Sequence, residues 1–449
     1  MTANTSFTKI RISLQEAGIK FVRILWCDNA NIIRGKAVHL EMLSDYFEHG
    51  VGICVGQQGV PVMYDAVVPE SGLGPVGEVR LVPDWSTLTL LPYAPGHARV
   101  MGNMMVNGEP WALCPRNFLK RMIAAAQLQD LEVQAAFENE FYLLKQTANG
   151  LEPLDSTIFA STQSMDFNRE VIDDIAEALI AQGITVEQYY PESGPGQQEI
   201  SMRYTDANGA ANRQIVFRET VRTIAHQHNL RASFLPKIFP DSAGSGCHIH
   251  LSLWRKGQNL LPDSQGICGL SQTAIAFIAG ILHHLPALVA LTTPSINSYR
   301  RLRPHCWSGA FRCWGLDNRE AAVRVPSNPA LGGSTNFELK TVDASANPYI
   351  ALGAVIAAGL DGIKRNLKPP SPISVDPGNL SIEERSLQGI EALPENLGEA
   401  IEKLQQNDVL LDALNPQLSQ AFIAVRQAEW LGMKDWNLAE EVKTLWARY

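Results

Sequence analysis

Four short segments alternate apolar and polar residues with the two-residue period of a β-strand, at 133–143, 199–204, 247–253 and 337–341. One face of each segment is apolar, and the opposite face carries mainly glutamate and histidine. In the first segment Glu138 and Glu140 stand two positions apart, so both carboxylates project from the same face. The alternation predicts an antiparallel sheet whose apolar face packs on helices.

Helical segments separate these strands. Amphipathic periodicity predicts helices over 115–130, 166–183 and 212–229, and a mostly helical tail over 378–449. Before residue 95 the pattern is different, with strands expected at 19–28 and 32–40 in a smaller α+β unit. We therefore expect an α+β protein with two domains, at 8–105 and 109–449.

The longest apolar stretch, 273–294, resembles a membrane span in length, but it contains His283, His284 and Pro286. These residues favour a buried helix interrupted by proline.

Composition narrows the class of protein further. The chain has 449 residues, of which 45% are apolar and 18% charged, and its formal net charge is −9. A negative chain disfavours nucleic acid or an anionic membrane as the main partner. The seven cysteines form no CxxC pair, and residues 1–20 contain no apolar signal core. Both features indicate a cytoplasmic protein with reduced thiols.

The residue types on the polar strand faces indicate metal binding. Alternation on one strand is typical of a sheet face in plain water, and such a face would mix lysine, threonine, serine and arginine. Here the faces present Glu138, Glu140, His248 and Glu338 instead. Carboxylate oxygens and imidazole nitrogens are suitable ligands for a divalent cation. We therefore prefer a metal site in a pocket over the sheet.

Glycine-rich turns lie next to three candidate ligands. Glu192 and Glu199 flank the turn in PESGPGQQEI, so the chain can bend to bring both carboxylates to one ion. His248 follows Gly244 and Gly246, which permit close approach of the backbone to a ligand. A lone histidine is more often a core residue, but on a face shared with glutamates we interpret His248 as a ligand.

A basic cluster precedes the last of these strands. The cluster consists of Arg300, Arg301, Arg303, Arg319 and Arg324, which fall within 25 residues. Such a run is usually a solvated surface, and we keep that interpretation for Arg300 and Arg303. Beside a metal pocket, arginines also bind phosphate or carboxylate groups. Carboxylates, divalent metals and arginines together indicate phosphoryl transfer, without a Walker A loop.

The motifs ENEFYLL, PESGPGQQEI, GSGCHIHLSL, INSYRRL, NREAAVRVP, NFELKTVDASANPY and GLDGI occur in this order. Together they resemble the glutamine synthetase family over nearly the whole chain. The segments CWGLDNREAAVR and FELK resemble more closely the divergent branch of this family, which includes nodulin-like, FluG-like and γ-glutamyl-amine ligase members. The resemblance implies an N-terminal β-grasp domain and a catalytic domain with a curved antiparallel sheet backed by helices. It also implies a ring-based homo-oligomer, a dodecamer, with active sites between subunits.

The resemblance also assigns roles to residues. It places Glu140, Glu192 and Glu199 at one metal site and Glu138, His248 and Glu338 at a second, with two or three Mg²⁺ or Mn²⁺ ions per active site. It implies ATP as a substrate, with nucleotide-binding residues His250, Ser252, Arg319 and Arg324. Arg301 matches the residue that binds the glutamate α-carboxylate, beside Gly244. Arg301 and Arg319 would be the catalytic arginines.

Departures from the family pattern surround the substrates and spare the metal ligands. Trp307 stands where ordinary members carry a flap glutamate that helps to deprotonate the amine. Lys340 replaces an arginine, and Ala243 and Asn336 replace an asparagine and an arginine. The ammonium-site aspartate has only Asp65 as an approximate match. These changes lead us to count Lys340 and Trp307 among the substrate-binding residues.

Losing an anionic partner weakens a site for ammonium, whereas tryptophan offers an apolar or cation–π surface. We therefore favour an ATP-dependent γ-glutamyl ligase that uses a primary amine larger than ammonia. Two alternatives stay open: ordinary glutamine synthesis, and a non-catalytic scaffold or metabolite sensor. All six candidate ligands are present, which argues against the last.

Overall fold

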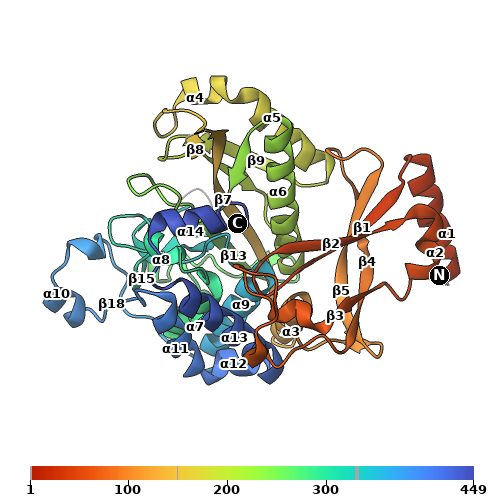
Figure 1. The fold of residues 1–449 in the computed structure, drawn as a ribbon. Helices are drawn as coiled ribbons and strands as arrows, with labels where there is room; N and C mark the ends of the chain where they lie inside the picture. The colour runs from red at the N-terminus through yellow and green to blue at the C-terminus, as the bar shows by residue number, and fades with distance from the viewer. Residues whose placement is uncertain (1–2, 149, 329–332) are drawn as a thin grey trace.

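Two β-sheets organise the structure, a computed structural model that describes residues 3–148, 150–328 and 333–449 (Figure 1). The N-terminal sheet contains β1 (Phe21–Cys27), β2 (Ile33–His39), β3 (Val51–Cys54), β4 (Glu78–Leu90), β5 (His97–Val106) and β6 (Glu109–Pro110). Its order is β2-β1-β5-β4-β3, with β6 beside β5, and β1 runs parallel to β5. Helices α1 (Ala3–Glu16) and α2 (Leu43–Tyr46) accompany it. This α+β arrangement agrees with the β-grasp expectation.

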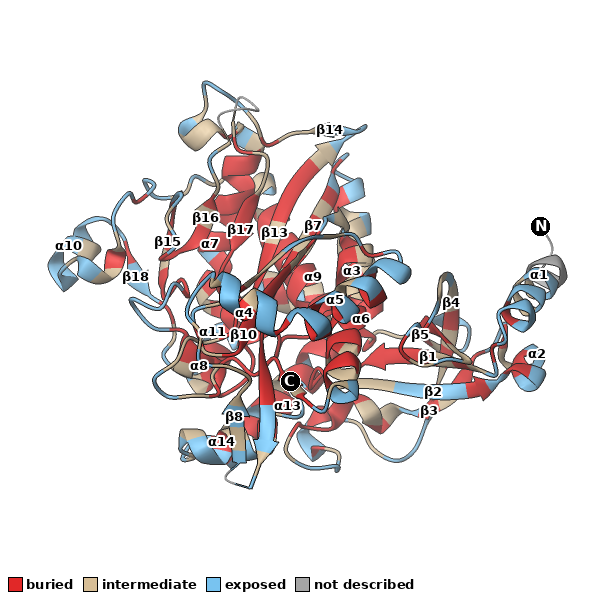
Figure 2. Ribbon diagram, turned by 90° about the horizontal axis from the view of Figure 1, so that it is seen from above, coloured by how far each residue is buried: buried red, intermediate tan, exposed pale blue. Residues whose placement is uncertain are grey.

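The second sheet carries the predicted alternating strands. Its members are β7 (Glu132–Thr147), β8 (Gly150–Pro153), β9 (Val186–Pro191), β10 (Gln197–Met202), β11 (Thr205–Asp206), β12 (Arg231–Ser233), β13 (Cys247–Arg255), β14 (Gln258–Asn259), β15 (Phe311–Leu316), β16 (Ala321–Val325), β17 (Phe337–Leu339) and β18 (Glu391–Ala392). The main path is β18-β15-β16-β17-β13-β7-β10-β9. It is antiparallel except between β15 and β16, which run parallel. Figure 2 shows its central strands as largely buried.

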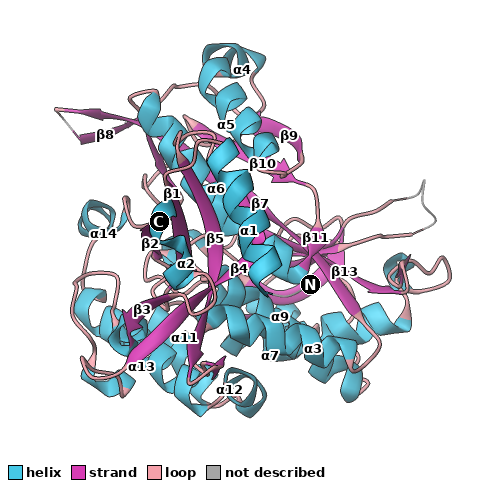
Figure 3. Ribbon diagram, turned by 90° about the vertical axis from the view of Figure 1, so that its right-hand side faces the viewer, coloured by secondary structure: helices cyan, strands magenta, loops and turns pink. Residues whose placement is uncertain are grey.

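Helices cover the apolar face of this sheet (Figure 3). The helices that follow the first sheet are α3 (Pro115–Gln127), α4 (Thr162–Phe167), α5 (Arg169–Ala181), α6 (Ala207–Gln227), α7 (Gln272–Thr292), α8 (Ser298–Arg301), α9 (Pro348–Lys364), α10 (Ile382–Leu387), α11 (Leu397–Gln405), α12 (Asp408–Leu414), α13 (Pro416–Met433) and α14 (Leu438–Leu445). Among them, α3, α6, α7 and α9 contribute buried side chains to the core beneath this sheet. Short 3₁₀ turns occupy Leu40–Met42, Val55–Gly59, Pro69–Ser71, Ile267–Gly269 and Pro377–Asn379. The predicted helical tail is confirmed.

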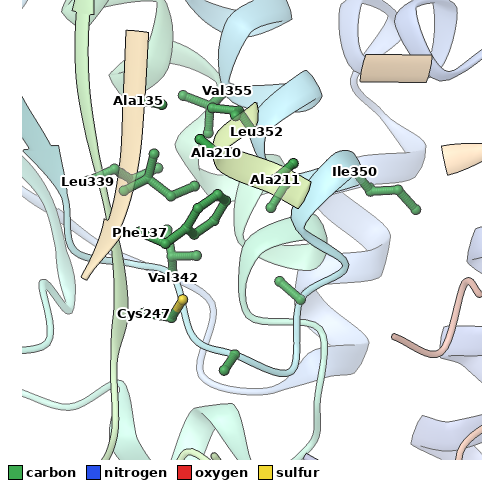
Figure 4. Close-up of a cluster of buried hydrophobic side chains, with 14 of the residues drawn as sticks. Ala135, Phe137, Ala210, Ala211, Cys247, Leu339, Val342, Ile350, Leu352 and Val355 are labelled. Atoms are coloured by element: carbon green, nitrogen blue, oxygen red, sulfur yellow. The ribbon is translucent and has the colours of Figure 1, made fainter. Parts of the chain in front are cut away.

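The predicted apolar strand faces form the core. Figure 4 shows Phe137 and Leu339 of the sheet packed with Ala211 of α6 and Leu352 of α9. The apolar face of β7 also contains a fully buried Asn139, whose Oδ1 accepts a hydrogen bond from Gln214 Nε2 at 2.7 Å. A buried amide needs such a partner because an unsatisfied one is costly.

Two strands are shorter than predicted. The strand expected at 199–204 ends at Met202, and the one expected at 337–341 ends at Leu339. Tyr204 therefore leaves the apolar face, is 48% exposed, and stacks on Trp254 with ring centroids 6.2 Å apart.

The apolar stretch forms α7, which crosses α9 at very close range. A Cβ on Gly280 would lie 2.1 Å from the Ala358 carbonyl oxygen, and one on Gly362 would lie 2.1 Å from that of Ala276. Only glycine fits such a backbone contact. Pro286 lies inside a continuous helix, so the expected interruption is absent, and packing against neighbouring helices holds α7 together. Among the described residues, α7 is the one helix long and apolar enough to cross a membrane, and it is mostly buried within the chain.

Buried polar contacts join the N-terminal segments to the C-terminal helices. Arg426 of α13 donates to the Asn29 carbonyl oxygen and pairs with Glu429, with Nη1 and Oε2 2.6 Å apart. Glu429 Oε1 in turn accepts the Val62 N–H at 2.7 Å. The strands up to Pro110 and those from Glu132 belong to separate sheets. The division at 8–105 and 109–449 stays a prediction.

Candidate active site

Strand register brings the predicted ligands together on the open face of the second sheet. Glu138 of β7 stands opposite His248 of β13. His250 stands opposite Glu338 of β17, and Glu140 stands opposite Glu199 of β10. Side chains directly opposite on neighbouring strands are within contact distance. Pairing therefore concentrates four carboxylates and two imidazoles.

Two histidines and two glutamates form the tightest group. His248 Nδ1 lies 3.0 Å from Glu338 Oε1 and 3.2 Å from Glu138 Oε1. His250 Nε2 lies 3.1 Å from Glu138 Oε2. Ligand atoms of Glu138, His250 and Glu338 all lie within 4.8 Å of one another. The sequence interpretation put His248 in this metal site and His250 at the nucleotide, whereas the structure brings both rings to Glu138.

The second group is more acidic. Glu140 Oε2 accepts the Gly246 N–H at 2.8 Å, and Glu192 Oε2 accepts the Ser193 N–H at 2.8 Å. Glu199 is 2% exposed; its burial, together with the charges of Glu138 and Glu140, raises its pKa to about 9. Burial and the Glu140 charge likewise raise the pKa of Glu192. Burial is the larger cause of both shifts, and the neighbouring negative charges add to it.

This donor set fits divalent cations. The second group holds three buried or partly buried glutamates, and the raised pKa values of Glu192 and Glu199 indicate negative charge that the neighbouring side chains do not neutralise. In the tighter group, burial alone would raise the pKa of Glu138, but hydrogen bonds from His248 and His250 lower it well below its usual range. The cluster therefore combines ionised oxygen ligands and imidazole nitrogens, the set that Mg²⁺ or Mn²⁺ accepts.

The basic residues beside this cluster differ in their burial and in the side chains that they contact. Arg301 is buried, and its Nη2 donates to His248 Nε2 at 2.9 Å. Arg324 Nε lies 2.6 Å from Glu338 Oε2, and Lys340 Nζ lies 3.2 Å from Glu338 Oε1. Arg319 is exposed. These contacts place three of the predicted cations against the metal-candidate face.

The other two arginines of the basic cluster lie outside it. Arg303 is exposed, as expected. Arg300 is not a free surface residue, because its Nη2 pairs with buried Glu441 Oε1 at 2.8 Å. That contact spans 141 residues of sequence.

The glycine predictions have a steric basis. A Cβ on Gly246 would lie 2.4 Å from His248 Nε2 and 2.5 Å from Arg301 Nη2. A Cβ on Gly244 would lie 2.7 Å from Arg301 Cγ. Both glycines therefore let Arg301 reach His248.

A cavity of about 330 Å³ adjoins the second histidine. Gln134, Tyr204, His250, Ser252, Trp254, Asn259, Thr335 and Asn336 are among its lining residues. Ser252 Oγ accepts the Trp254 indole N–H at 2.8 Å, and Trp254 stacks on Tyr204. An aromatic wall beside polar side chains can hold a flat heterocycle.

Trp307 lies on a loop at the edge of the site. Its indole is 58% exposed, and the Arg319 guanidinium lies 5.7 Å from its ring centroid. Its backbone N–H donates to Glu320 Oε1 at 2.8 Å. Asp65 is exposed, and the Ala243 carbonyl oxygen accepts the Tyr142 hydroxyl at 2.7 Å.

Sequence reasoning missed two residues that fix the acidic turn. Gln197 Nε2 donates to the Gly244 carbonyl oxygen at 3.0 Å and to Glu140 Oε2 at 3.5 Å. Asp155 Oδ1 accepts the Gly196 N–H at 3.0 Å. Both hold the segment between Glu192 and Glu199. Gln197 is the first glutamine of GPGQQE, where the pattern indicated only a polar strand position, and Asp155 lies on a distant segment.

Comparisons with known proteins cover almost the whole chain. The family model described as glutamine synthetase, catalytic domain, matches residues 112–443, and the glutamine synthetase N-terminal domain model matches 9–111. Type-1 glutamine synthetase 1 of Dictyostelium discoideum is 37% identical, over 94% of this chain and 88% of its own length. Gamma-glutamylpolyamine synthetase GlnA3 of Streptomyces coelicolor is 36% identical, over 94% and 92%. A solved GmaS/ADP complex superimposes with a TM-score of 0.84 at 30% identity, over 97% and 98%.

Proposed function

The chain belongs to the glutamine synthetase family, and from this premise we propose that it is an ATP-dependent carboxylate–amine ligase. The proposed reaction joins the γ-carboxylate of glutamate to a primary amine larger than ammonia. A carboxylate is a poor electrophile, so ATP first converts it into γ-glutamyl phosphate. The amine nitrogen then attacks the acyl carbon, the C–N bond forms, and the bond to phosphate breaks.

The observation that carries this proposal is the set of five glutamates and a histidine pair on and beside one sheet face, bordered by arginines. Glu140, Glu192 and Glu199 would hold one divalent cation, and Glu138 and Glu338 would hold another together with a histidine. When bound, such cations neutralise charge on the phosphates. We assign His248 as the histidine ligand, and the test of that choice is metal affinity in His248→Ala against His250→Ala.

Different residues would bind the nucleotide and the glutamate. We assign the aromatic cavity beside His250 and Ser252 to the nucleotide base, and Arg319 and Arg324 to its phosphates. Arg301, with the Gly244 backbone, would bind the glutamate α-carboxylate, because a guanidinium forms two parallel bonds to a carboxylate. Lys340, held at Glu338, would supply a second positive charge near the acid substrate. Arg301 and Arg319 thus take the catalytic roles, since Arg301 would touch the acid substrate and Arg319 the phosphates of ATP.

Trp307 supports an organic amine. It is an exposed aromatic ring where ordinary members carry the flap glutamate, and aromatic faces bind organic cations. The similarity to a γ-glutamylpolyamine synthetase supports the same substrate class. The second candidate is glutamine synthesis from ammonia, which the 37% identity to a type-1 glutamine synthetase favours.

Phosphate release from ATP tests the proposal directly. Purified protein receives glutamate, Mg²⁺ or Mn²⁺, and in turn ammonium, alkylamines, ethanolamine and diamines. We expect turnover with organic amines, and turnover with ammonium alone would establish the second candidate instead. No turnover with any amine would argue against both and leave either a different acid substrate or a non-catalytic role. We also propose that the protein is cytoplasmic and forms a ring-shaped dodecamer with active sites shared between subunits. Light scattering, which measures the mass of the assembly, tests the number of subunits.

A further inference from the structure

A second cavity, of about 400 Å³, is lined in part by Trp307. His305, Trp307, Asp317, Arg319, Glu320 and Asp376 are among its lining residues. A water-sized ion needs only about 30 Å³, so the cavity has the size of a site for an organic molecule.

Glu320 is the unusual member of this lining. It is 7% exposed, and its Oε1 accepts the Trp307 backbone N–H. Its Oε2 is buried and has no hydrogen-bond partner in the part of the chain that the structure describes. A buried carboxylate oxygen without a donor is costly, and a cationic ligand relieves that cost. Burial also raises the pKa of Glu320, and Asp376 adds to the rise.

The cavity is acidic as a whole. Asp376 Oδ2 lies 3.0 Å from His305 Nδ1, and Asp317 Oδ1 accepts the Ser327 N–H at 2.9 Å. Three carboxylates, those of Asp317, Glu320 and Asp376, thus line the cavity together with one guanidinium, that of Arg319, which lies over the Trp307 ring. In the proposed reaction Arg319 contacts phosphate, which leaves the ring face free for another cation.

The loop that frames the cavity has a fixed shape. His305 and Trp307 have φ values of 59° and 52°, which side-chain-bearing residues seldom adopt. Such positions persist where surrounding contacts enforce them, and the bond from Trp307 to Glu320 is one of these contacts. The strained loop therefore holds the indole at the cavity wall.

The cavity also connects to the metal-candidate face. Strand β16 begins at Ala321, directly after Glu320, and pairs with β17 through Arg324 and Glu338. The Lys340 N–H donates to the Ala322 carbonyl oxygen at 2.9 Å. Glu320 and the proposed reaction centre are thus fixed to one another by a short rigid strand.

We infer that this cavity binds the amine substrate as an organic cation, with the Glu320 carboxylate as its counter-charge and Trp307 as its apolar wall. The inference rests on the proposed ligase function and names the specificity-determining residue for its amine. Glu320 takes over, from a different position, the negative charge that the flap lacks.

Steady-state kinetics of Glu320→Gln test the inference. Glutamine still accepts the Trp307 N–H, so the loop is retained while the charge is lost. For an aliphatic diamine we expect KM to rise by about 10- to 100-fold, the usual effect of losing a charge-assisted contact. The KM for glutamate should not change. Hydroxylamine, which is largely uncharged at neutral pH, should react equally well with both proteins. Glu391→Gln removes a charge from an exposed site and serves as the matched control.

Glu320→Asp keeps the charge and should retain part of the diamine affinity. An equal change in KM for diamine and hydroxylamine would indicate a merely structural role for Glu320 and overturn the inference, as would no change for either. Product formation by the wild type distinguishes a failure of this inference from a failure of the proposed function. If it makes a γ-glutamyl amide but Glu320→Gln is unaffected, only the inference fails. If it uses no organic amine, the proposed function fails with it.

Discussion

Glu429→Ala is expected to cost about 4 kcal/mol of unfolding free energy, because it leaves a buried guanidinium without its counter-charge. Arg426 and Glu429 of α13 are 0% and 1% exposed, and their charged atoms lie 2.6 Å apart. Removing one partner of such a pair typically costs about 3–5 kcal/mol. The substitution also removes the acceptor of the Val62 N–H. Since the whole protein is stable by about 5–15 kcal/mol, much of its stability would be lost.

Urea unfolding followed by tryptophan fluorescence measures this cost as a shift of the midpoint. Glu391→Ala is the matched control, because Arg312 and Glu391 are also 2.6 Å apart but their side chains are 27% and 62% exposed. An exposed pair contributes at most about 1 kcal/mol. The double change Arg426→Met with Glu429→Leu should recover at least half of the loss, since no buried charge remains. Equal losses in Glu429→Ala and Glu391→Ala would refute the reasoning.

The remaining predictions concern the site. Glu140→Ala should lower ATP turnover by at least about 100-fold with unchanged circular dichroism, and unchanged turnover would remove the metal assignment. Mg²⁺ or Mn²⁺ should raise the thermal midpoint of the wild type, by about 2.7 kcal/mol of stability at 100 times Kd, and should fail to do so in Glu140→Ala. Trp307→Glu should lower KM for ammonium several-fold in the phosphate-release assay, and no gain would count against the flap argument. Burial opposes the shift, but bonds from Ser164, Thr157 and Asn168 lower the pKa of Asp155. Its contribution is therefore fully present above the ordinary aspartate pKa and is lost as pH falls through the lower pKa of the folded state, so urea midpoints of wild type and Asp155→Asn should converge on acidification.

Much of the fold and the metal-candidate set could be predicted because both depend on local periodicity. A two-residue period assigns every side chain of a strand to a face, so Glu138, Glu140, His248 and Glu338 could be grouped before their pairing was known. Asn139 was the exception, since its buried partner Gln214 lies on α6, far away in sequence.

Features set by distant segments could not be predicted. Arg300 looked like a solvated cation because its partner Glu441 follows 141 residues later. Glu320 lies in the motif NREAAVR, in which sequence reasoning assigned a role to the arginines but none to Glu320. Its burial and its contact with Trp307 arise only when the loop around Trp307 folds over the start of β16. The choice between His248 and His250 likewise depends on ring positions that spacing does not specify.

The glycine crossing of α7 and α9 has a consequence for biosynthesis. Helix α7 is apolar on nearly every side, and its closest covering helix ends at Lys364, 72 residues after Thr292. At about 5–20 residues per second, a ribosome needs roughly 4–14 seconds to deliver that cover. During this interval a nascent chain carries an uncovered segment with the hydropathy of a membrane span. Slow translation between residues 292 and 364 would therefore lengthen the period in which chaperones, and aggregation, compete for it.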